Sequence, residues 1–186
     1  RDLYEGLDRV LRTYNSAGYT IKTIKCDREF EPMLNKVKDE FGITLDCPPS
    51  GAKVPEAERN NRTIGERIRA WYHNCPYRAV PKIIMKAATA RCTAQLNYFP
   101  AKGGASSHYS PHQLILQRPV DFDKELCHTT GAYCQAEIFK QQARNDNSPR
   151  VIDGIYLRPM PNGQGHYIMN LATGMEMTSH KIWERP

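Results

Sequence analysis

Two glycines near the start of the chain, Gly18 and Gly42, each follow a run of apolar residues at helical spacing. The runs cover residues 1–17 and 29–41, and their period predicts two helices. A glycine directly after such a run is a common helix stop, because glycine adopts the left-handed backbone conformation without a steric penalty. The sequence therefore predicts two short helices with defined ends.

Each glycine is followed by a stretch that favours a β-strand, over residues 19–26 and residues 43–45. A third helix is predicted soon after the second stretch, so the order is helix, strand, helix, strand, helix. This order is typical of an α/β sheet whose parallel strands are joined by helical crossovers. We therefore predict an α/β fold, in which functional groups gather at the carboxyl ends of the strands.

Two carboxylates occupy positions of interest in this predicted order. Asp27 comes directly after the first strand, and Glu58 lies in the first turn of the third helix. The 30 residues between them are enough for one helix, one strand and a loop. Carboxylate oxygens at such positions can hold a divalent metal. Asp27 can equally be a helix N-cap, and the two roles are compatible.

The third helix has two predicted faces. With about 100° per residue, one stripe is apolar and a second, polar stripe lies roughly 120° away. The apolar stripe comprises Ala57, Ile64, Ile68 and Trp71, and the polar stripe Glu58, Arg62, Gly65 and Arg69. In one interpretation, Glu58 is a metal ligand, and the arginines that follow it on the same stripe bind successive phosphates of a nucleic-acid backbone. The alternative is an acidic residue favoured by the helix dipole, with Glu58 and Arg62 as an ordinary ion pair.

The positive charge is concentrated around this helix. The chain has a net charge of +6, and residues 51–100 carry nine basic and three acidic side chains, an excess that equals the whole net charge. A basic excess around acidic metal-ligand candidates suits chemistry on phosphodiesters. A solvated helical face is the simpler alternative.

The composition argues against a disordered chain and against a membrane-spanning protein. The chain has 186 residues, 40% hydrophobic and 25% charged, as expected of a soluble globular protein with a core of its own. Its apolar runs are far shorter than the roughly 20 residues that cross a bilayer. It begins at Arg1 without a methionine, so we expect a piece of a longer polypeptide.

The six cysteines are scattered, which favours reduced thiols in an intracellular protein over a disulfide scaffold. Cys127 and His128 with Cys134, or His73 with Cys75, could bind zinc, but neither set has a second pair at finger spacing.

Two blocks of sequence resemble the integrase region of Ty1/copia-type retrotransposon polyproteins. Cys26-Asp27-Arg28-Glu29-Phe30 resembles that family's Asp-Asn-Gly-x-Glu-Phe motif. Val54-Pro55-Glu56-Ala57-Glu58-Arg59-Asn60-Asn61-Arg62-Thr63 resembles the block that carries its final catalytic glutamate. By this match the ligand is Glu58, not Glu56.

The resemblance implies an RNase H-like core that uses Mg²⁺ (or Mn²⁺) held by an Asp, Asp, Glu set. Asp27 would be the second aspartate and Glu58 the glutamate, both catalytic and metal-binding. The first aspartate would lie upstream of Arg1, so the isolated chain is expected to be inactive. The residues expected to contact DNA are Arg59, Asn61, Arg62 and Arg69.

The partners implied by this resemblance are the DNA ends of the element and a target duplex, with a homo-oligomer and no membrane association. The implied location is the nucleus, with a cytoplasmic particle stage. The implied reaction is the metal-dependent joining of element DNA to target DNA.

The downstream half changes character. Residues 81–97 predict a helix, and Ser110-Pro111 the start of another. After Leu126, short strand-like runs cover residues 131–136, 151–158, 166–171 and 175–178, with a polar loop over 141–149. This part is similar to the SH3-like unit that follows the copia integrase core. We therefore predict a truncated core over residues 1–126 and a small β module, without an assigned ligand, over residues 127–186.

Two other functions remain open. A decayed or domesticated element could have kept the fold as a non-catalytic DNA- or protein-binding module. The altered Asp27 block, the missing first aspartate and Gly65 inside a helix favour this alternative. A cellular RNase H-like nuclease would share the ligands but explains the β module poorly.

Overall fold

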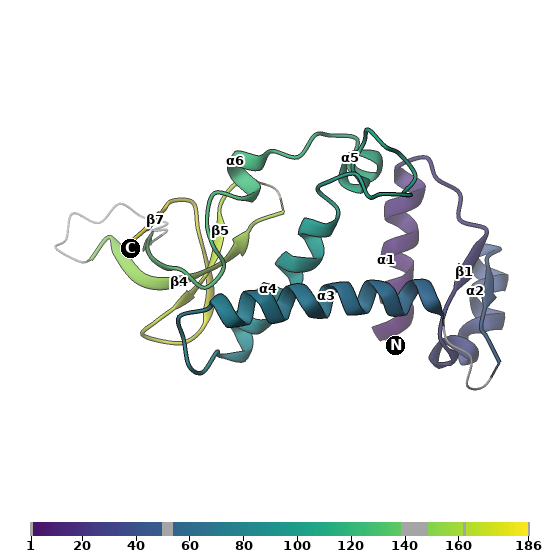
Figure 1. Ribbon diagram of the computed structural model, residues 1–186, viewed down its shortest axis with the longest axis horizontal. Coiled ribbons are helices and arrows are strands. Elements are labelled where there is room, and N and C mark those ends of the chain that lie inside the picture. The colour runs from purple at the N-terminus through teal and green to yellow at the C-terminus, as the bar shows by residue number, and fades with distance from the viewer. Residues whose placement is uncertain (1, 50–53, 139–148, 162, 186) are drawn as a thin grey trace. The chain divides into compact units, whose positions relative to one another are not determined.

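The computed structural model describes residues 2–49, 54–138, 149–161 and 163–185 (Figure 1). Its fold is mixed α/β, as predicted. The helices are α1 (Asp2–Ser16), the 3-10 helix η1 (Arg28–Met33), α2 (Leu34–Phe41), α3 (Pro55–Asn74), α4 (Lys82–Leu96), α5 (Pro111–Leu116) and α6 (Phe122–Glu125). The strands are β1 (Thr23–Lys25), β2 (Thr44–Asp46), β3 (Tyr133–Glu137), β4 (Val151–Pro159), β5 (His166–Asn170), β6 (Glu176–Ser179) and β7 (Ile182–Glu184).

The chain divides into two compact units. Unit 1 comprises Arg1–Gly65 and Phe99–Pro119, and unit 2 comprises Glu66–Tyr98 and Val120–Pro186. The helix α3 therefore contributes its first part to unit 1 and its last part to unit 2.

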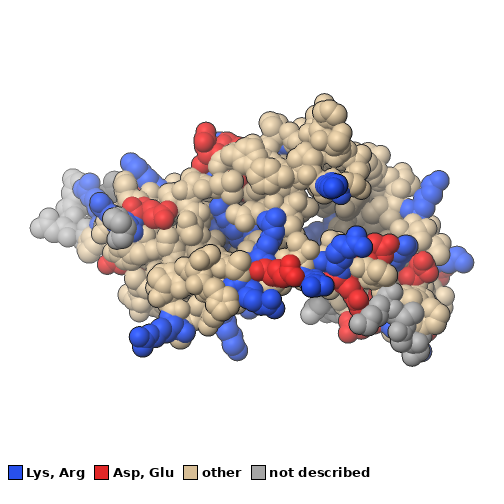
Figure 2. All heavy atoms as spheres, viewed as in Figure 1, with Lys and Arg blue, Asp and Glu red and all other residues tan. Residues whose placement is uncertain are grey.

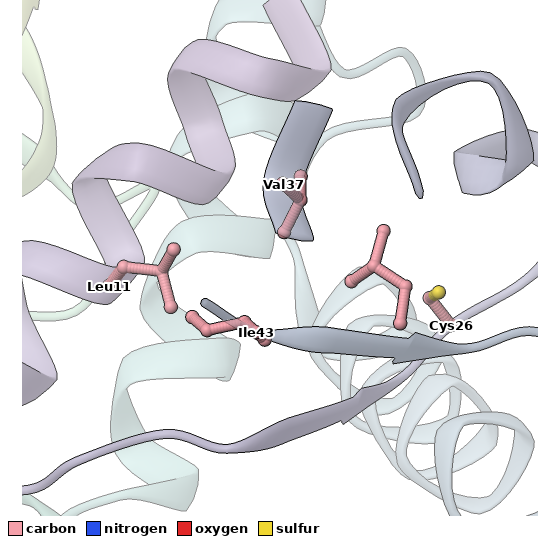
Figure 3. Packing of buried hydrophobic residues seen from close by; sticks show 5 residues of the cluster. Leu11, Cys26, Val37 and Ile43 are labelled. Carbon is pink, nitrogen blue, oxygen red and sulfur yellow. The ribbon is translucent and has the colours of Figure 1, made fainter. Parts of the chain in front are cut away.

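Unit 1 contains a parallel pair of strands, β1 and β2, with Thr23 opposite Thr44 and Lys25 opposite Asp46. Helices α1 and α2 supply apolar side chains to the core beside these strands (Figure 3). The buried residues of this core are Leu11, Cys26, Val37, Ile43 and Leu45. The predicted order of helices and parallel strands is confirmed in this unit.

The helix predicted over residues 29–41 divides in two, as η1 and α2. Pro32 lies inside η1 and lacks the amide hydrogen that an α-helix beginning at Glu29 would donate to the Arg28 carbonyl. The predicted stop at Gly42 is confirmed, because this residue adopts a left-handed conformation with φ of 66°. Its amide donates to the Lys38 carbonyl at 3.0 Å, which closes α2.

Unit 2 is built on a five-stranded antiparallel sheet with the strand order β6-β5-β4-β3-β7. Strands β3 to β6 form a meander, and β7 returns to pair with β3. Helix α4 shares a core with this sheet, since Ile84 and Ala87 cluster with Ile155, Leu157 and Met169. A second cluster comprises Cys134, Ala136, Tyr156, Ile168 and Ile182.

The four strands predicted after Leu126 are confirmed, and β7 is an addition that the sequence pattern did not indicate. The predicted loop over 141–149 lies, up to residue 148, outside the described residues. Helix α4, predicted as part of the first domain, shares its core with the sheet; the domain boundary after residue 126 stays a prediction. In the described part of the chain, no helix has the length and apolar character to cross a bilayer.

The predicted helix start at Ser110 is also confirmed. The Ser110 hydroxyl accepts a hydrogen bond from the Gln113 amide at 3.2 Å, and the Gln113 side chain accepts one from the Ser110 amide at 2.9 Å. This capping box satisfies backbone donors at the start of α5, where Pro111 takes the first helical position.

Candidate active site

Two aspartates lie at the carboxyl ends of the parallel strands of unit 1. Asp46 is the last residue of β2, and Asp27 follows β1 by two residues. The strands stay paired to this point, because the Cys26 amide donates to the Asp46 carbonyl at 3.1 Å. Both aspartates are exposed. The structure thus brings two carboxylate-bearing chain segments to one edge of the strand pair.

Asp27 also has the capping role that the sequence left open. It is the N-cap of η1, and its Oδ1 accepts a hydrogen bond from the Arg28 amide at 2.7 Å. The Asp27 carbonyl accepts another from the Phe30 amide at 3.0 Å. These bonds fix the backbone at Asp27. A carboxylate has about four lone-pair positions, so one hydrogen bond leaves it able to bind a cation.

The first turn of α3 is joined to β1 by an ion pair. Lys25 Nζ lies 3.4 Å from Glu56 Oε1, and both side chains are mostly exposed. A hydrogen bond from its own backbone amide, followed by the one from Lys25, holds the pKa of Glu56 below its usual value. An exposed pair of this kind contributes little stability. Its significance is geometric, because Glu58 lies in the same helical turn as Glu56.

Glu58 occupies the position that the sequence predicts, in the first turn of α3. Its amide donates to the Val54 carbonyl at 3.1 Å, and its side chain is exposed. The four residues predicted to contact DNA are also exposed on this helix: Arg59, Asn61, Arg62 and Arg69. Figure 2 shows Lys and Arg side chains, with acidic side chains between them, along the surface of α3.

The predicted apolar stripe of α3 is only partly correct. Ile64, Ile68 and Trp71 are half-buried, but Ala57 is exposed. Among its described side chains α3 has none that is fully buried. Ala57 belongs to the part of α3 in unit 1, and the cluster of buried residues in that unit is formed by residues outside α3. Trp71 packs with unit 2 and donates to the Thr130 carbonyl at 3.0 Å.

Two cysteines lie directly beside these aspartates. Cys26 Sγ and Cys47 Sγ are 3.3 Å apart, and the Cys47 thiol lies 3.9 Å from the Asp27 carbonyl oxygen. Burial, and then the hydrogen bond with Cys47, raise the pKa of Cys26. Both thiols are free.

An open pocket of about 490 Å³ lies next to the strand ends. Arg28, Asp46 and Cys47 are among its lining residues, whereas Asp27 and Glu58 are not. Within the described ranges, no group of three or more His, Cys, Asp and Glu side chains is arranged to hold a metal ion. The Mg²⁺ site at Asp27 and Glu58 therefore stays a prediction, as do the zinc alternatives.

Asp46 and Lys25 also lie at this edge of the strand pair, but they were not among the site residues predicted from the sequence. The signal for Asp46 was present, because it follows its strand much as Asp27 follows the preceding strand. Lys25 gave no such signal, since its partner Glu56 lies 31 residues away.

The chain matches no protein-family model and no curated protein.

Proposed function

We propose that this chain is part of a metal-dependent polynucleotidyl transferase, an integrase of the Ty1/copia kind that joins element DNA ends to target DNA. Unit 1 would supply part of an RNase H-like core. The sheet of unit 2 would form an SH3-like module, which its meander and the return of β7 beside β3 support.

One observation supports the proposal most. The Lys25–Glu56 ion pair joins the first turn of α3 to β1, at a distance of 3.4 Å. The pair is evidence that the segments carrying Asp27 and Glu58 lie near each other, although Glu58, two residues after Glu56, projects from a different side of α3. Two distant carboxylates are thus carried by segments that meet at the end of a parallel strand.

The donor chemistry fits a hard divalent cation. Asp27 and Glu58 offer exposed carboxylate oxygens, the ligands that Mg²⁺ prefers, and an upstream aspartate would complete the set. When bound, Mg²⁺ polarises the phosphodiester and makes the attacking hydroxyl a better nucleophile. The chain itself would position the carboxylates: the η1 cap fixes the backbone at Asp27, and the first turn of α3 carries Glu58.

The exposed cations of α3 would bind the polyanionic substrate. Arg59, Arg62 and Arg69 are exposed on α3, whose first turn contains Glu58, and Asn61 can donate to a phosphate oxygen. Phosphate contacts of this kind set position and affinity without reading the base sequence.

Replacing Arg69 by alanine tests this assignment. We expect weaker binding to duplex DNA at every sequence, with a plot of log affinity against log salt less steep by about 0.9 for one lost phosphate contact. Fluorescence anisotropy with a labelled duplex over a series of salt concentrations measures this slope.

The matched control is Arg12→Ala on α1, because the Arg12 guanidinium is engaged with Asp8 at 2.9 Å. This variant should keep the slope of the unmodified chain. Equal slopes for the unmodified chain and Arg69→Ala would exclude Arg69 as a phosphate contact. The catalytic part of the proposal is tested by Mg²⁺-dependent joining of DNA, as described below.

A further inference from the structure

The ends of β1 and β2 place two thiols side by side. Because Lys25 pairs with Asp46, the next position along the parallel strands sets Cys26 beside Cys47. The hydrogen bond from the Cys26 amide to the Asp46 carbonyl, at 3.1 Å, continues the pairing to this point. The two sulfur atoms are 3.3 Å apart.

This arrangement is suited to a covalent bond between the sulfurs. Neighbouring strands lie about 4.8 Å apart, within the range of Cα separations, roughly 4.4 to 6.8 Å, that a disulfide bridges. The sulfurs would have to approach from 3.3 Å to about 2.05 Å. Small side-chain rotations can supply this change, without a rearrangement of the strands.

The two thiols differ in access to solvent. Cys26 is 7% exposed and belongs to the same buried cluster of unit 1 as Leu11 and Val37 (Figure 3). Cys47 is half-buried and lines the open pocket at the strand ends. A small oxidant dissolved in water therefore reaches Cys47 first, and the Cys26 sulfur lies 3.3 Å from the Cys47 sulfur.

We propose that Cys26 and Cys47 form a reversible dithiol–disulfide pair that a peroxide oxidises. The Cys47 sulfur attacks one peroxide oxygen and the O–O bond breaks, which gives a Cys47 sulfenic acid and one water. The Cys26 sulfur then attacks the sulfenic sulfur, so that the S–S bond forms, the S–O bond breaks and a second water leaves. Two thiols are oxidised by two electrons, and the peroxide is reduced to water.

The disulfide would lie next to Asp27 and at the start of the segment that leads to α3. Cys26 directly precedes Asp27, and the Cys47 thiol that lies 3.9 Å from the Asp27 carbonyl would be consumed. The cross-link itself goes beyond the proposed function and does not depend on it. If the experiment disproves the cross-link, the proposed integrase function is unaffected, and the reverse also holds.

Peptide mapping of the reduced chain tests the pair directly. The folded chain of residues 1–186 is treated with an equimolar amount of hydrogen peroxide, its remaining thiols are alkylated, and it is digested without reductant. We expect a peptide pair linked through Cys26 and Cys47, lighter by two hydrogen atoms than the separate peptides and absent after treatment with dithiothreitol. When oxidation is carried out in denaturing urea, the Cys26–Cys47 linkage should no longer be favoured over linkages between other cysteines.

Two serine variants serve as controls. Cys127→Ser removes an exposed thiol outside unit 1 and should leave the Cys26–Cys47 linkage unchanged. Cys47→Ser should leave Cys26 reduced after the same treatment. The proposal is overturned if Cys47 of the folded chain accumulates as a sulfinic acid, or links to another cysteine, while Cys26 stays reduced.

Discussion

A Glu58→Gln variant should lose Mg²⁺-dependent DNA joining by about a thousandfold or more, measured in a longer chain that carries the first aspartate expected from the integrase proposal. Glutamine keeps the size of the side chain but removes the negative charge that a metal ligand supplies. A thousandfold lower rate corresponds to a loss of several kcal/mol of transition-state stabilisation, because each tenfold change in rate equals about 1.4 kcal/mol. The measurement is the rate at which a labelled DNA end is joined to a target duplex.

Glu56→Gln is the matched control, since Glu56 and Glu58 share the first turn of α3. Glu56 contacts Lys25 and has no proposed metal contact, so its variant should retain joining to within about tenfold. If Glu56→Gln lost much more joining activity than Glu58→Gln, Glu56 and not Glu58 would be the metal ligand. DNA binding by both variants should remain salt-dependent, which separates a loss of chemistry from a loss of folding.

Replacing Leu11 by alanine should destabilise unit 1 by about 2 to 5 kcal/mol. Leu11 is 1% exposed and clusters with Val37 and Ile43, so its loss leaves a cavity in a small core (Figure 3). Urea unfolding followed by circular dichroism should show a transition at lower denaturant concentration than in the unmodified chain.

The neighbouring residue provides the comparison. Val10 is on the same helix but 49% exposed, and Val10→Ala should change the free energy of unfolding by less than about 0.5 kcal/mol. Equal destabilisation by the two substitutions would contradict the assignment of Leu11 to the core.

The local order of unit 1 could be predicted because its signals are local. Each of two runs of apolar residues at helical spacing is followed by a glycine, Gly18 or Gly42. This pattern indicates the end of a helix and does not depend on contacts with distant parts of the chain. The same applies to the capping box at Ser110 and to the short alternating runs of the sheet. By contrast, β7 is defined by its pairing with β3, a strand that lies much earlier in the chain.

The candidate site could be predicted only in part. The places of Asp27 after a strand and of Glu58 in the first turn of a helix could be predicted, because both depend on local sequence patterns; their role as metal ligands stays a prediction. The Lys25–Glu56 pair and the Cys26–Cys47 contact depend on how β1, β2 and α3 come together, which a sequence does not state. The exposed Ala57 shows the same limit, because helical periodicity does not say which residues of an apolar face meet a core.

The most direct test of the proposed activity is the joining of a labelled DNA end to a target duplex by the upstream-extended protein. We expect joined product with Mg²⁺, and none after the metal is removed with a chelator. Salt-sensitive DNA binding without any joined product in Mg²⁺ would contradict it, and would favour a decayed module that binds DNA without chemistry.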